Sequence, residues 1–158
     1  MTEVLFHRHM IDPTATAQFA QAMATVIAPG DCFLLEGNIG AGKTFFARCL
    51  IQSLLCTPED VPSPTFTLVQ TYDTQKGPVH HTDLYRLSSS DELIELGLLD
   101  ALETDICLIE WPDRLGGDAP KTALTLSFSR GSQPDARSIN ISGKSAHWDD
   151  RLTGLLND

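Results

Sequence analysis

The eight residues from Gly37 to Thr44 read G-x-x-x-x-G-K-T, a spacing that can hold the phosphates of a nucleotide. Glycines in such a loop allow backbone angles and close approaches that a side chain would prevent, so the loop N–H groups can face phosphate oxygens. Lys43 would reach the β- and γ-phosphates, and the Thr44 hydroxyl would ligate Mg²⁺. The predicted nucleotide contacts are therefore the whole stretch: Gly37, Asn38, Ile39, Gly40, Ala41, Gly42, Lys43 and Thr44.

An acid, Glu110, follows the apolar run 106–109 and is itself followed by Trp111. In open α/β sheets ligands bind at the carboxyl ends of the strands, so an acid at such an end lies beside the Mg²⁺ of a phosphate loop. A buried strand that leads into a surface loop would have the same sequence pattern, but it does not explain why an acid stands at the end of the strand. We therefore predict that Glu110 lies beside the Mg²⁺ of the phosphate loop. Trp111 could stack on a base, contact a partner or simply pack, and its residue type leaves all three open.

A second acid, Asp83, lies near the end of residues 79–84, which also have the pattern of a strand. It could cap the next helix, or it could be a carboxylate close to Mg²⁺ or to the attacking water. His81 shares a face with Asp83 because the two are two residues apart, whereas His80 points to the opposite face. This alternation argues against a metal site made from the adjacent histidines.

Residues 63–72 begin with Ser63, Pro64 and Thr65 and continue as a strand-like run. A turn that leads into a strand explains this stretch. In a phosphate-loop protein, a hydroxyl-rich loop after the first helix can also be a switch segment that meets the γ-phosphate and the metal. Both interpretations stay open.

The elements that must position these groups follow from apolar periodicity and turn residues. A buried strand at 32–36 precedes the loop, and a helix at 43–56 follows it. The remaining expectations are an edge strand at 4–7, a helix at 13–27, antiparallel strands at 66–73 and 79–84, helices at 90–96 and 98–102, a hairpin of 122–129 with 137–141, and a helix at 148–156. This order predicts an α/β, P-loop NTPase-like three-layer fold, with a mixed, mostly parallel sheet, flanking helices and antiparallel hairpins. Residues 1–158 are expected to form a single domain.

The composition restricts the classes of function. The 158 residues include 21 acids and 11 basic side chains, and a net charge of −10 disfavours direct binding of nucleic acid. Residues 87–113 contain eight acids and no Lys or Arg, which fits a solvated face or a docking face for a basic protein. Four cysteines without a C-x-x-C spacing indicate reduced thiols. Without a membrane-spanning run or a visible secretory signal, we expect a cytoplasmic location and no membrane contact.

Four motifs occur together in order: Gly37–Thr44 and residues 63–69, 81–86 and 109–112. With them the chain resembles the bacterial TsaE (YjeE) family of ATPases in tRNA threonylcarbamoyladenosine biosynthesis, from about residue 16 to residue 137. Two departures are Asn38, where the family usually has Asp, and Thr82, where an aromatic residue is common. Neither change removes a metal ligand or the loop lysine, so we expect activity to persist.

The resemblance implies a protein that binds ATP and Mg²⁺ and hydrolyses ATP weakly without its partners. Those partners would be the threonylcarbamoyl transferase subunit (TsaD) and its non-catalytic paralogue (TsaB). Their complex modifies the adenosine next to the anticodon in tRNAs that read codons beginning with A. The protein would meet tRNA only through that complex.

The same resemblance assigns roles by position. Lys43 is catalytic and, with the loop amides, holds phosphates. Asp83 is catalytic near the γ-phosphate, either as the base for water or as an indirect Mg²⁺ ligand, and we expect it to serve hydrolysis more than binding. The direct Mg²⁺ ligands would be Thr44 and Glu110. Thr65 and Trp111 would be further nucleotide contacts.

Three other functions use the same kind of loop. A small-molecule kinase usually needs mobile arginines around the transferred phosphate, and this chain has no pair of them close in sequence after the first helix. A GTPase switch usually carries N-K-x-D, which is absent. A binding module that senses nucleotide without useful hydrolysis would share every residue discussed. The adenine pocket has three candidates: residues 12–16, the loop after Trp111, and Arg137.

Overall fold

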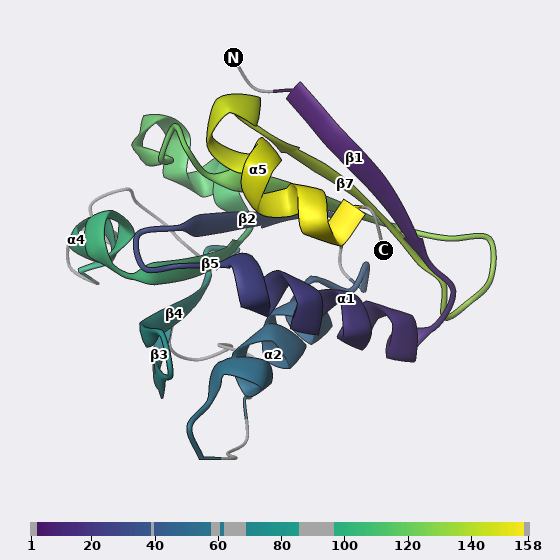
Figure 1. Ribbon diagram of the computed structural model, residues 1–158, viewed down its shortest axis with the longest axis horizontal. Coiled ribbons are helices and arrows are strands. Elements are labelled where there is room, and N and C mark those ends of the chain that lie inside the picture. The colour runs from purple at the N-terminus through teal and green to yellow at the C-terminus, as the bar shows by residue number, and fades with distance from the viewer. Residues whose placement is uncertain (1–2, 39, 58–60, 62–68, 86–96, 157–158) are drawn as a thin grey trace.

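The computed structural model describes residues 3–38, 40–57, 61, 69–85 and 97–156 (Figure 1). Its elements are β1 (Glu3–Met10), α1 (Pro13–Val26), β2 (Cys32–Glu36), α2 (Lys43–Leu54), β3 (Val69–Thr74), β4 (Gly77–Asp83), α4 (Leu98–Thr104), β5 (Ile106–Glu110), the short 3-10 helix η1 (Pro112–Asp118), β6 (Leu124–Arg130), β7 (Arg137–Gly143) and α5 (Ser145–Leu156). Three residues that the sequence places at the site lie outside the described residues, namely Ile39, Ser63 and Thr65. The predicted helix at 90–96 also lies outside them. None of the described helices is long and apolar enough to cross a membrane.

The strands form a seven-stranded sheet in the order β1-β7-β6-β2-β5-β4-β3. β2 pairs in parallel with β5 and β6, and β5 pairs in parallel with β4. The outer pairs β1–β7, β6–β7 and β3–β4 are antiparallel. The mixed sheet, its hairpins and the edge position of β1 confirm the prediction. Because the central strands are parallel, their carboxyl ends meet where β2 enters the phosphate loop.

Helices cover both faces of the sheet and produce three layers (Figure 1). Alternate side chains of β2 point to the two faces of the sheet and pack in two different cores. Phe33 and Leu35 lie in a core with α1, α2 and α5, whereas Cys32 and Leu34 lie in a second core with α4 and η1. All four are buried. A strand covered on both faces reads as a continuous apolar run, which explains the sequence before the loop.

Charged side chains hold α1 and α5 around the start of β2. A carboxylate oxygen of Asp12 accepts a backbone N–H of the first turn of α1 at 2.8 Å, and Pro13 occupies the start of that helix. At its other end, Nζ of Lys76 donates to three main-chain carbonyl groups at 2.6–3.1 Å. Arg151 of α5 pairs with Asp31, which directly precedes β2. The strand that feeds the loop is thus fixed by contacts from distant parts of the chain.

Several predicted boundaries are wrong by a few residues. α2 ends at Leu54 because Leu55 leaves the helix and forms a bridge with Thr74. β1 continues to Met10 because β7 offers backbone partners along its whole length. β4 starts earlier, β6 and β7 end later, and α5 begins at Ser145. These ends depend on pairing with distant strands, which local sequence patterns do not contain.

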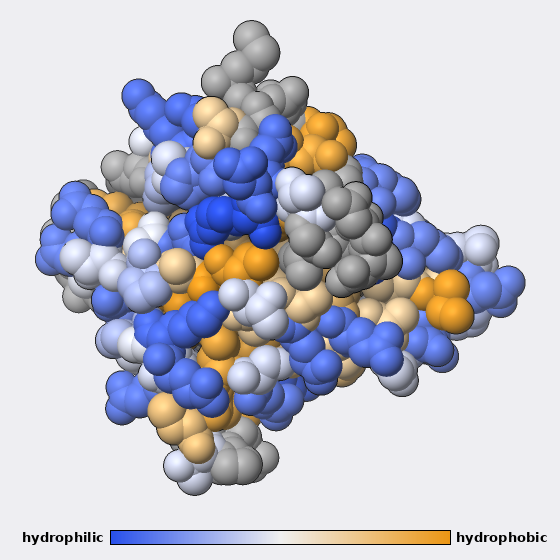
Figure 2. Space-filling view, in the orientation of Figure 1, coloured by the Kyte–Doolittle hydropathy of each residue, from blue (hydrophilic) through white to orange (hydrophobic). Residues whose placement is uncertain are grey.

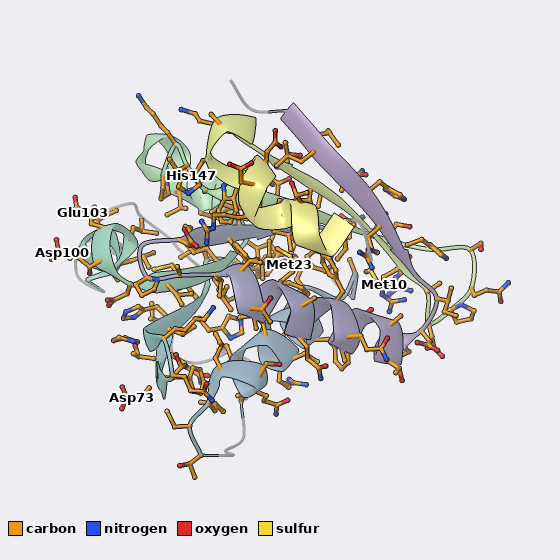
Figure 3. The ribbon with its side chains drawn as sticks, viewed as in Figure 1. Met10, Met23, Asp73, Asp100, Glu103 and His147 are labelled. Atoms are coloured by element: carbon orange, nitrogen blue, oxygen red, sulfur yellow. The ribbon has the colours of Figure 1, made fainter. Side chains whose placement is uncertain are left out.

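The acidic run in the second half of the chain divides into separate groups. Asp100 and Glu103 are exposed on α4, and Figure 3 shows both at the outer margin of the molecule. Asp105 pairs with His80, and Glu110 is buried. On the face drawn in Figure 2, hydrophilic residues predominate and hydrophobic ones show between them. The described acids of this run therefore differ in their surroundings, from exposed on α4 to buried at the end of β5.

The four cysteines are free thiols. Cys32 and Cys107 are buried register partners on β2 and β5. Burial raises the pKa of Cys107 to about 12 and the pKa of Cys32 well above its ordinary value. Both thiols are therefore weak nucleophiles and serve as small apolar core residues.

Candidate functional site

The loop between β2 and α2 requires glycine at three positions. Gly37, Gly40 and Gly42 have φ values of 140°, 81° and 107°, which side chains of L-residues rarely adopt. At Gly37 an added Cβ atom would also lie 2.6 Å from the main-chain oxygen of Phe128 on β6. Gly42 is the N-cap of α2, and no side chain caps the first turn. The N–H groups of that turn and the positive end of the helix therefore suit a bound phosphate.

Asn38 and Ala41 close the loop on itself. The N–H of Ala41 donates to the Asn38 carbonyl at 3.0 Å. The Asn38 side chain is exposed, whereas Ala41 is buried in the larger core. Because the backbone of Asn38 makes this contact, Asn in place of Asp is compatible with the loop geometry.

Lys43 begins α2 and is only 5% exposed. Its Nζ donates to the Gly37 carbonyl at 2.6 Å and lies 3.5 Å from the centroid of the Trp111 ring. Burial lowers the pKa of Lys43, while the negative charges of nearby carboxylates, Glu110 foremost, oppose this shift. The ammonium group is thus largely desolvated beside the loop, where a phosphate would be a stronger partner than a carbonyl oxygen.

A continuous series of hydrogen bonds joins α2, β5 and β4. Thr44 Oγ1 donates to Glu110 Oε1 at 2.7 Å, and Glu110 Oε2 lies 2.7 Å from Nε2 of His81. Glu110 is 2% exposed and His81 is fully buried. The parallel register, which pairs Glu110 with Leu35 on one side and with Asp83 on the other, creates this arrangement. The predicted pair of Thr44 and Glu110 is therefore in direct contact.

Asp83 ends β4 as the register partner of Glu110. Its Oδ1 accepts the N–H of Tyr85 at 2.9 Å, so the carboxylate also holds the turn that leaves the strand. Burial, the largest cause, raises the pKa of Asp83. The hydrogen bond from the Tyr85 N–H lowers this pKa, the charge of Glu110 raises it, and the charge of Lys43 lowers it. A partly buried carboxylate with a raised pKa next to a second acid is typical of a functional acid or base.

The raised pKa of Asp83 predicts an effect of pH on stability. In the unfolded chain this carboxyl group returns to its ordinary pKa of 3.8, so the native state binds the proton more tightly. Its ionisation then destabilises the native state fully above the folded pKa and not at all below the unfolded pKa. We expect Asp83→Asn to raise the free energy of unfolding at about pH 8, and to raise it by less at about pH 4.

Chemical denaturation of both proteins across this pH range would measure the difference. Asparagine keeps the oxygen that accepts the Tyr85 N–H, so the turn is preserved. A stabilisation that stays the same at both pH values would contradict the ionisation argument.

Trp111 follows β5 in an unusual conformation. Among the described residues it alone, apart from glycines, has a positive φ, 59° with ψ 55°. Its ring lies over the Lys43 ammonium, and the Tyr85 ring contacts it with centroids 4.9 Å apart. Strained residues of this kind cluster at functional sites. In the structure the Trp111 ring packs on the loop lysine, and its predicted contact with a nucleotide stays a prediction.

The oxygen atoms gathered here suit Mg²⁺. Thr44 and Glu110 supply a hydroxyl and a carboxylate that contact each other, and Asp83 is next to Glu110 in register. Mg²⁺ usually takes one or two protein ligands and fills its remaining positions with phosphate oxygens and water. Within the part of the chain that the structure describes, no group of three or more His, Cys, Asp or Glu side chains could hold a metal ion. Thr44 and Glu110 therefore fit Mg²⁺ that arrives with a nucleotide.

Two arginines lie against the loop, and sequence reasoning missed this arrangement. Nη2 of Arg130 lies 2.6 Å from the point that a Cβ atom on Gly40 would occupy, and Arg137 lies 3.6 Å from the corresponding point on Gly42. The two arginines are direct partners on β6 and β7. The hairpin thus brings together arginines that are separated in sequence, so their separation is no argument against a kinase. Alternation along the predicted hairpin is the signal that could have revealed the pair.

A cavity of about 220 Å³ adjoins the end of the loop. The residues that line it come from α1, α2 and the β6–β7 hairpin: Pro13, Thr16, Gly42, Phe45, Asp135 and Arg137. The cavity unites two of the three candidates for the adenine pocket, residues 12–16 and Arg137. The loop after Trp111 does not line it.

Comparison with known proteins agrees with this geometry. Residues 10–139 match the family described as "Threonylcarbamoyl adenosine biosynthesis protein TsaE". A relative from Rickettsia bellii named tRNA threonylcarbamoyladenosine biosynthesis protein TsaE is 45% identical over 62% of this chain and 68% of its own length. The relative of the same name from Rickettsia felis is 44% identical, and the match spans 57% of its length.

More distant proteins match over longer stretches. A Bacillus subtilis protein with that name is 34% identical over 83% of this chain and 81% of its own length. A crystal structure of Bacillus subtilis YdiB superposes with a TM-score of 0.76 at 26% identity and covers 99% of this chain and 97% of that one. The match through residues 10–139 includes the phosphate loop, Asp83, Glu110 and Arg137. This chain therefore belongs to the TsaE family.

Proposed function

We propose that the protein binds ATP with Mg²⁺ and hydrolyses it slowly as an accessory component of tRNA threonylcarbamoyladenosine biosynthesis. The observation that carries the proposal is the direct contact of Thr44 with Glu110 beside Lys43, at the point where β2 enters the loop. The family and the names of its members support the biosynthetic role. Hydrolysis and the need for Mg²⁺ are the finer parts of the proposal.

Different groups of the chain would bind the different phosphates and the Mg²⁺ of the nucleotide. The loop N–H groups and the start of α2 surround the β-phosphate, and Lys43 leaves the Gly37 carbonyl to hold β- and γ-phosphate oxygens. Thr44 and Glu110 would hold Mg²⁺, which neutralises charge on the phosphates when bound. Thr65, which lies outside the described residues, would contact the nucleotide from the segment after α2.

Asp83 would act on the attacking water. Its carboxylate is partly buried, and its raised pKa brings it closer to the range in which a carboxylate removes a proton effectively. Its turn with Tyr85 and its register beside Glu110 hold it in place. We assign it to hydrolysis, as the group that orients the water or takes its proton.

The adenine base of the nucleotide would occupy the cavity beside Gly42. Phe45, 36% exposed on the first turn of α2, offers an aromatic surface to the base, and Arg137 closes another side of the cavity. Nη1 of Arg137 donates to the carbonyl groups of Pro134 and Ala136 at 2.8 Å, so the position of this side chain is set before a ligand arrives. In this placement, residues of α1, α2 and the β6–β7 hairpin supply the contacts to adenine.

Phe45→Ala is expected to weaken ADP binding at least about fivefold, because stacking of a base on an aromatic ring contributes about 1–3 kcal/mol. Binding of tripolyphosphate, which has no base, should change less than about twofold. Calorimetric titration of each ligand into both proteins measures this. Unchanged ADP affinity would place the base elsewhere, with the loop after Trp111 as the next candidate.

The proposed partners are the threonylcarbamoyl transferase subunit (TsaD) and its paralogue (TsaB). The net charge of −10 supports an indirect relation to tRNA, because the partners would have to supply the basic surface that tRNA requires. The location would be the cytoplasm, where that modification occurs.

The test is ATP turnover by the protein alone and then with both partners and tRNA. Slow turnover that rises with the partners, together with threonylcarbamoyl transfer, would support the proposal. Phosphate transfer to a small acceptor without any response to partners would instead establish the kinase alternative. Tight ATP binding without turnover under every condition would indicate a nucleotide-sensing module.

A further inference from the structure

The buried imidazole of His81 contacts the oxygen of Glu110 that faces away from Thr44. Nε2 of His81 lies 2.7 Å from Glu110 Oε2, while Oε1 of the same carboxylate accepts the Thr44 hydroxyl at 2.7 Å. The exposed fractions of the His81 and Glu110 side chains are 0% and 2%. Each carboxylate oxygen thus has its own partner, one on β4 and one on α2.

This arrangement removes the rotational freedom of the carboxylate. Glutamate ends in a broad torsion that does not by itself select an orientation of the two oxygens. The bond from His81 selects one orientation and turns Oε1 toward Thr44. An ionised carboxylate only accepts hydrogen bonds, so the hydrogen between the two groups belongs to Nε2 of His81.

The other ring nitrogen supports the same assignment. Nδ1 of His81 is buried and has no hydrogen-bond partner among the residues that the structure describes. With the hydrogen on Nε2, Nδ1 carries only a lone pair, and an unpaired acceptor is better tolerated in a core than an unpaired N–H donor. The ring is therefore placed for one purpose, its bond to Glu110.

We propose that His81 is a positioning residue, which orients Glu110 so that Oε1 and the Thr44 hydroxyl together form the protein half of the Mg²⁺ site. The proposal rests on the proposed function, since it concerns the metal that accompanies the nucleotide. It adds a residue on β4, two positions before Asp83, to the machinery of the site. Partners that orient metal ligands commonly contribute about 10- to 100-fold to metal affinity.

The adjacent histidine provides a matched control. His80 makes a bond of the same kind, with Nε2 2.8 Å from Asp105 Oδ2, and its Nδ1 lies 3.1 Å from Thr71 Oγ1. It lies on the same strand and points to the opposite face, and the side chains of this pair are 17% and 27% exposed. Replacement of His80 therefore removes a histidine–carboxylate pair from β4 without touching the site.

The experiment measures Mn²⁺ binding in the ADP complex by electron paramagnetic resonance of free Mn²⁺, with Mn²⁺ as the probe for Mg²⁺. We expect His81→Leu to weaken Mn²⁺ binding about 10- to 100-fold and His81→Gln, whose amide N–H can replace Nε2–H, to weaken it less than about fivefold. His80→Leu should change it less than about twofold. ADP affinity in EDTA should stay within about twofold of the wild type in all three variants, because His81 touches no phosphate-binding group.

Each other outcome has a definite meaning. Wild-type Mn²⁺ affinity in folded His81→Leu would overturn the positioning role, and so would equal losses in His81→Leu and His81→Gln. If His81→Leu does not fold, His81→Asn replaces it: its shorter amide does not reach Glu110, so Mn²⁺ affinity equal to that of His81→Gln would overturn the role. Failure of the wild type to bind ADP or Mn²⁺ would instead overturn the proposed function.

Discussion

Lys43→Ala is expected to lower ATP turnover at least about 100-fold and to weaken ATP binding about tenfold or more. Lys43 is a buried cation at the loop, and among the described residues its Nζ contacts the Gly37 carbonyl and the face of the Trp111 ring. A γ-phosphate would replace these weak partners with charge-assisted bonds that strengthen as charge develops in the transition state. Calorimetric titration with ATP and steady-state phosphate release measure the two effects separately.

Lys121→Ala is the matched control, because Lys121 is an exposed lysine far along the chain from the loop. It should change both quantities less than about twofold. Thermal unfolding confirms that Lys43→Ala is folded. Turnover within a few-fold of the wild type in a folded Lys43→Ala protein would remove Lys43 from the catalytic groups, whatever its effect on affinity.

The fluorescence of Trp111 can report the movement of Lys43 to the phosphates of ATP. Since the Lys43 ammonium lies 3.5 Å from the Trp111 ring centroid, transfer of the ammonium to phosphate changes the surroundings of the indole. The second tryptophan, Trp148, is fully buried in the larger core and donates its indole N–H to the Thr122 carbonyl at 2.8 Å. Fluorescence changes on ATP addition are therefore attributable to Trp111.

The phosphate loop was predictable because its chemistry is local. Three glycines, a lysine and a threonine at fixed spacing determine where the backbone N–H groups point, and no distant contact is needed to recognise them. The contact of Thr44 with Glu110 was predictable for a different reason. The rule that ligands bind at the carboxyl ends of parallel strands places the acid after β5 beside the loop after β2.

The surroundings of these groups were not predictable from local patterns. The bond from His81 to Glu110 depends on the register of β4 against β5, and the placement of Arg130 and Arg137 depends on how the β6–β7 hairpin closes. Alternation put His81 on the same face as Asp83 but did not identify its partner. The left-handed conformation of Trp111 has no signature in its residue type. The prediction for Ser63 and Thr65 concerns residues outside the described part of the chain and stays a prediction.

Asp83→Asn is expected to lower ATP turnover about 100- to 1,000-fold while ATP affinity stays within about threefold of the wild type. Asparagine keeps the shape of the side chain and the oxygen that accepts the Tyr85 N–H, so the turn after β4 survives. Asparagine lacks the negative charge and the ability to take a proton that we propose act on the attacking water. Because no part of the proposed phosphate cradle is removed, binding should persist, in contrast to Lys43→Ala, which loses both.

Asp113→Asn separates proton chemistry from simple loss of charge. The Asp113 side chain is 74% exposed, yet its charge also acts on Lys43. Its replacement should lower turnover less than about threefold, because an exposed charge is screened by solvent. Equal losses of turnover in the two variants would show that Asp83 acts only through the field at Lys43. Equal losses of ATP affinity in Asp83→Asn and Lys43→Ala would show that Asp83 holds the nucleotide. A stable, ATP-binding but inactive Asp83→Asn protein is the combination expected of a carboxylate that folding disfavours and catalysis requires.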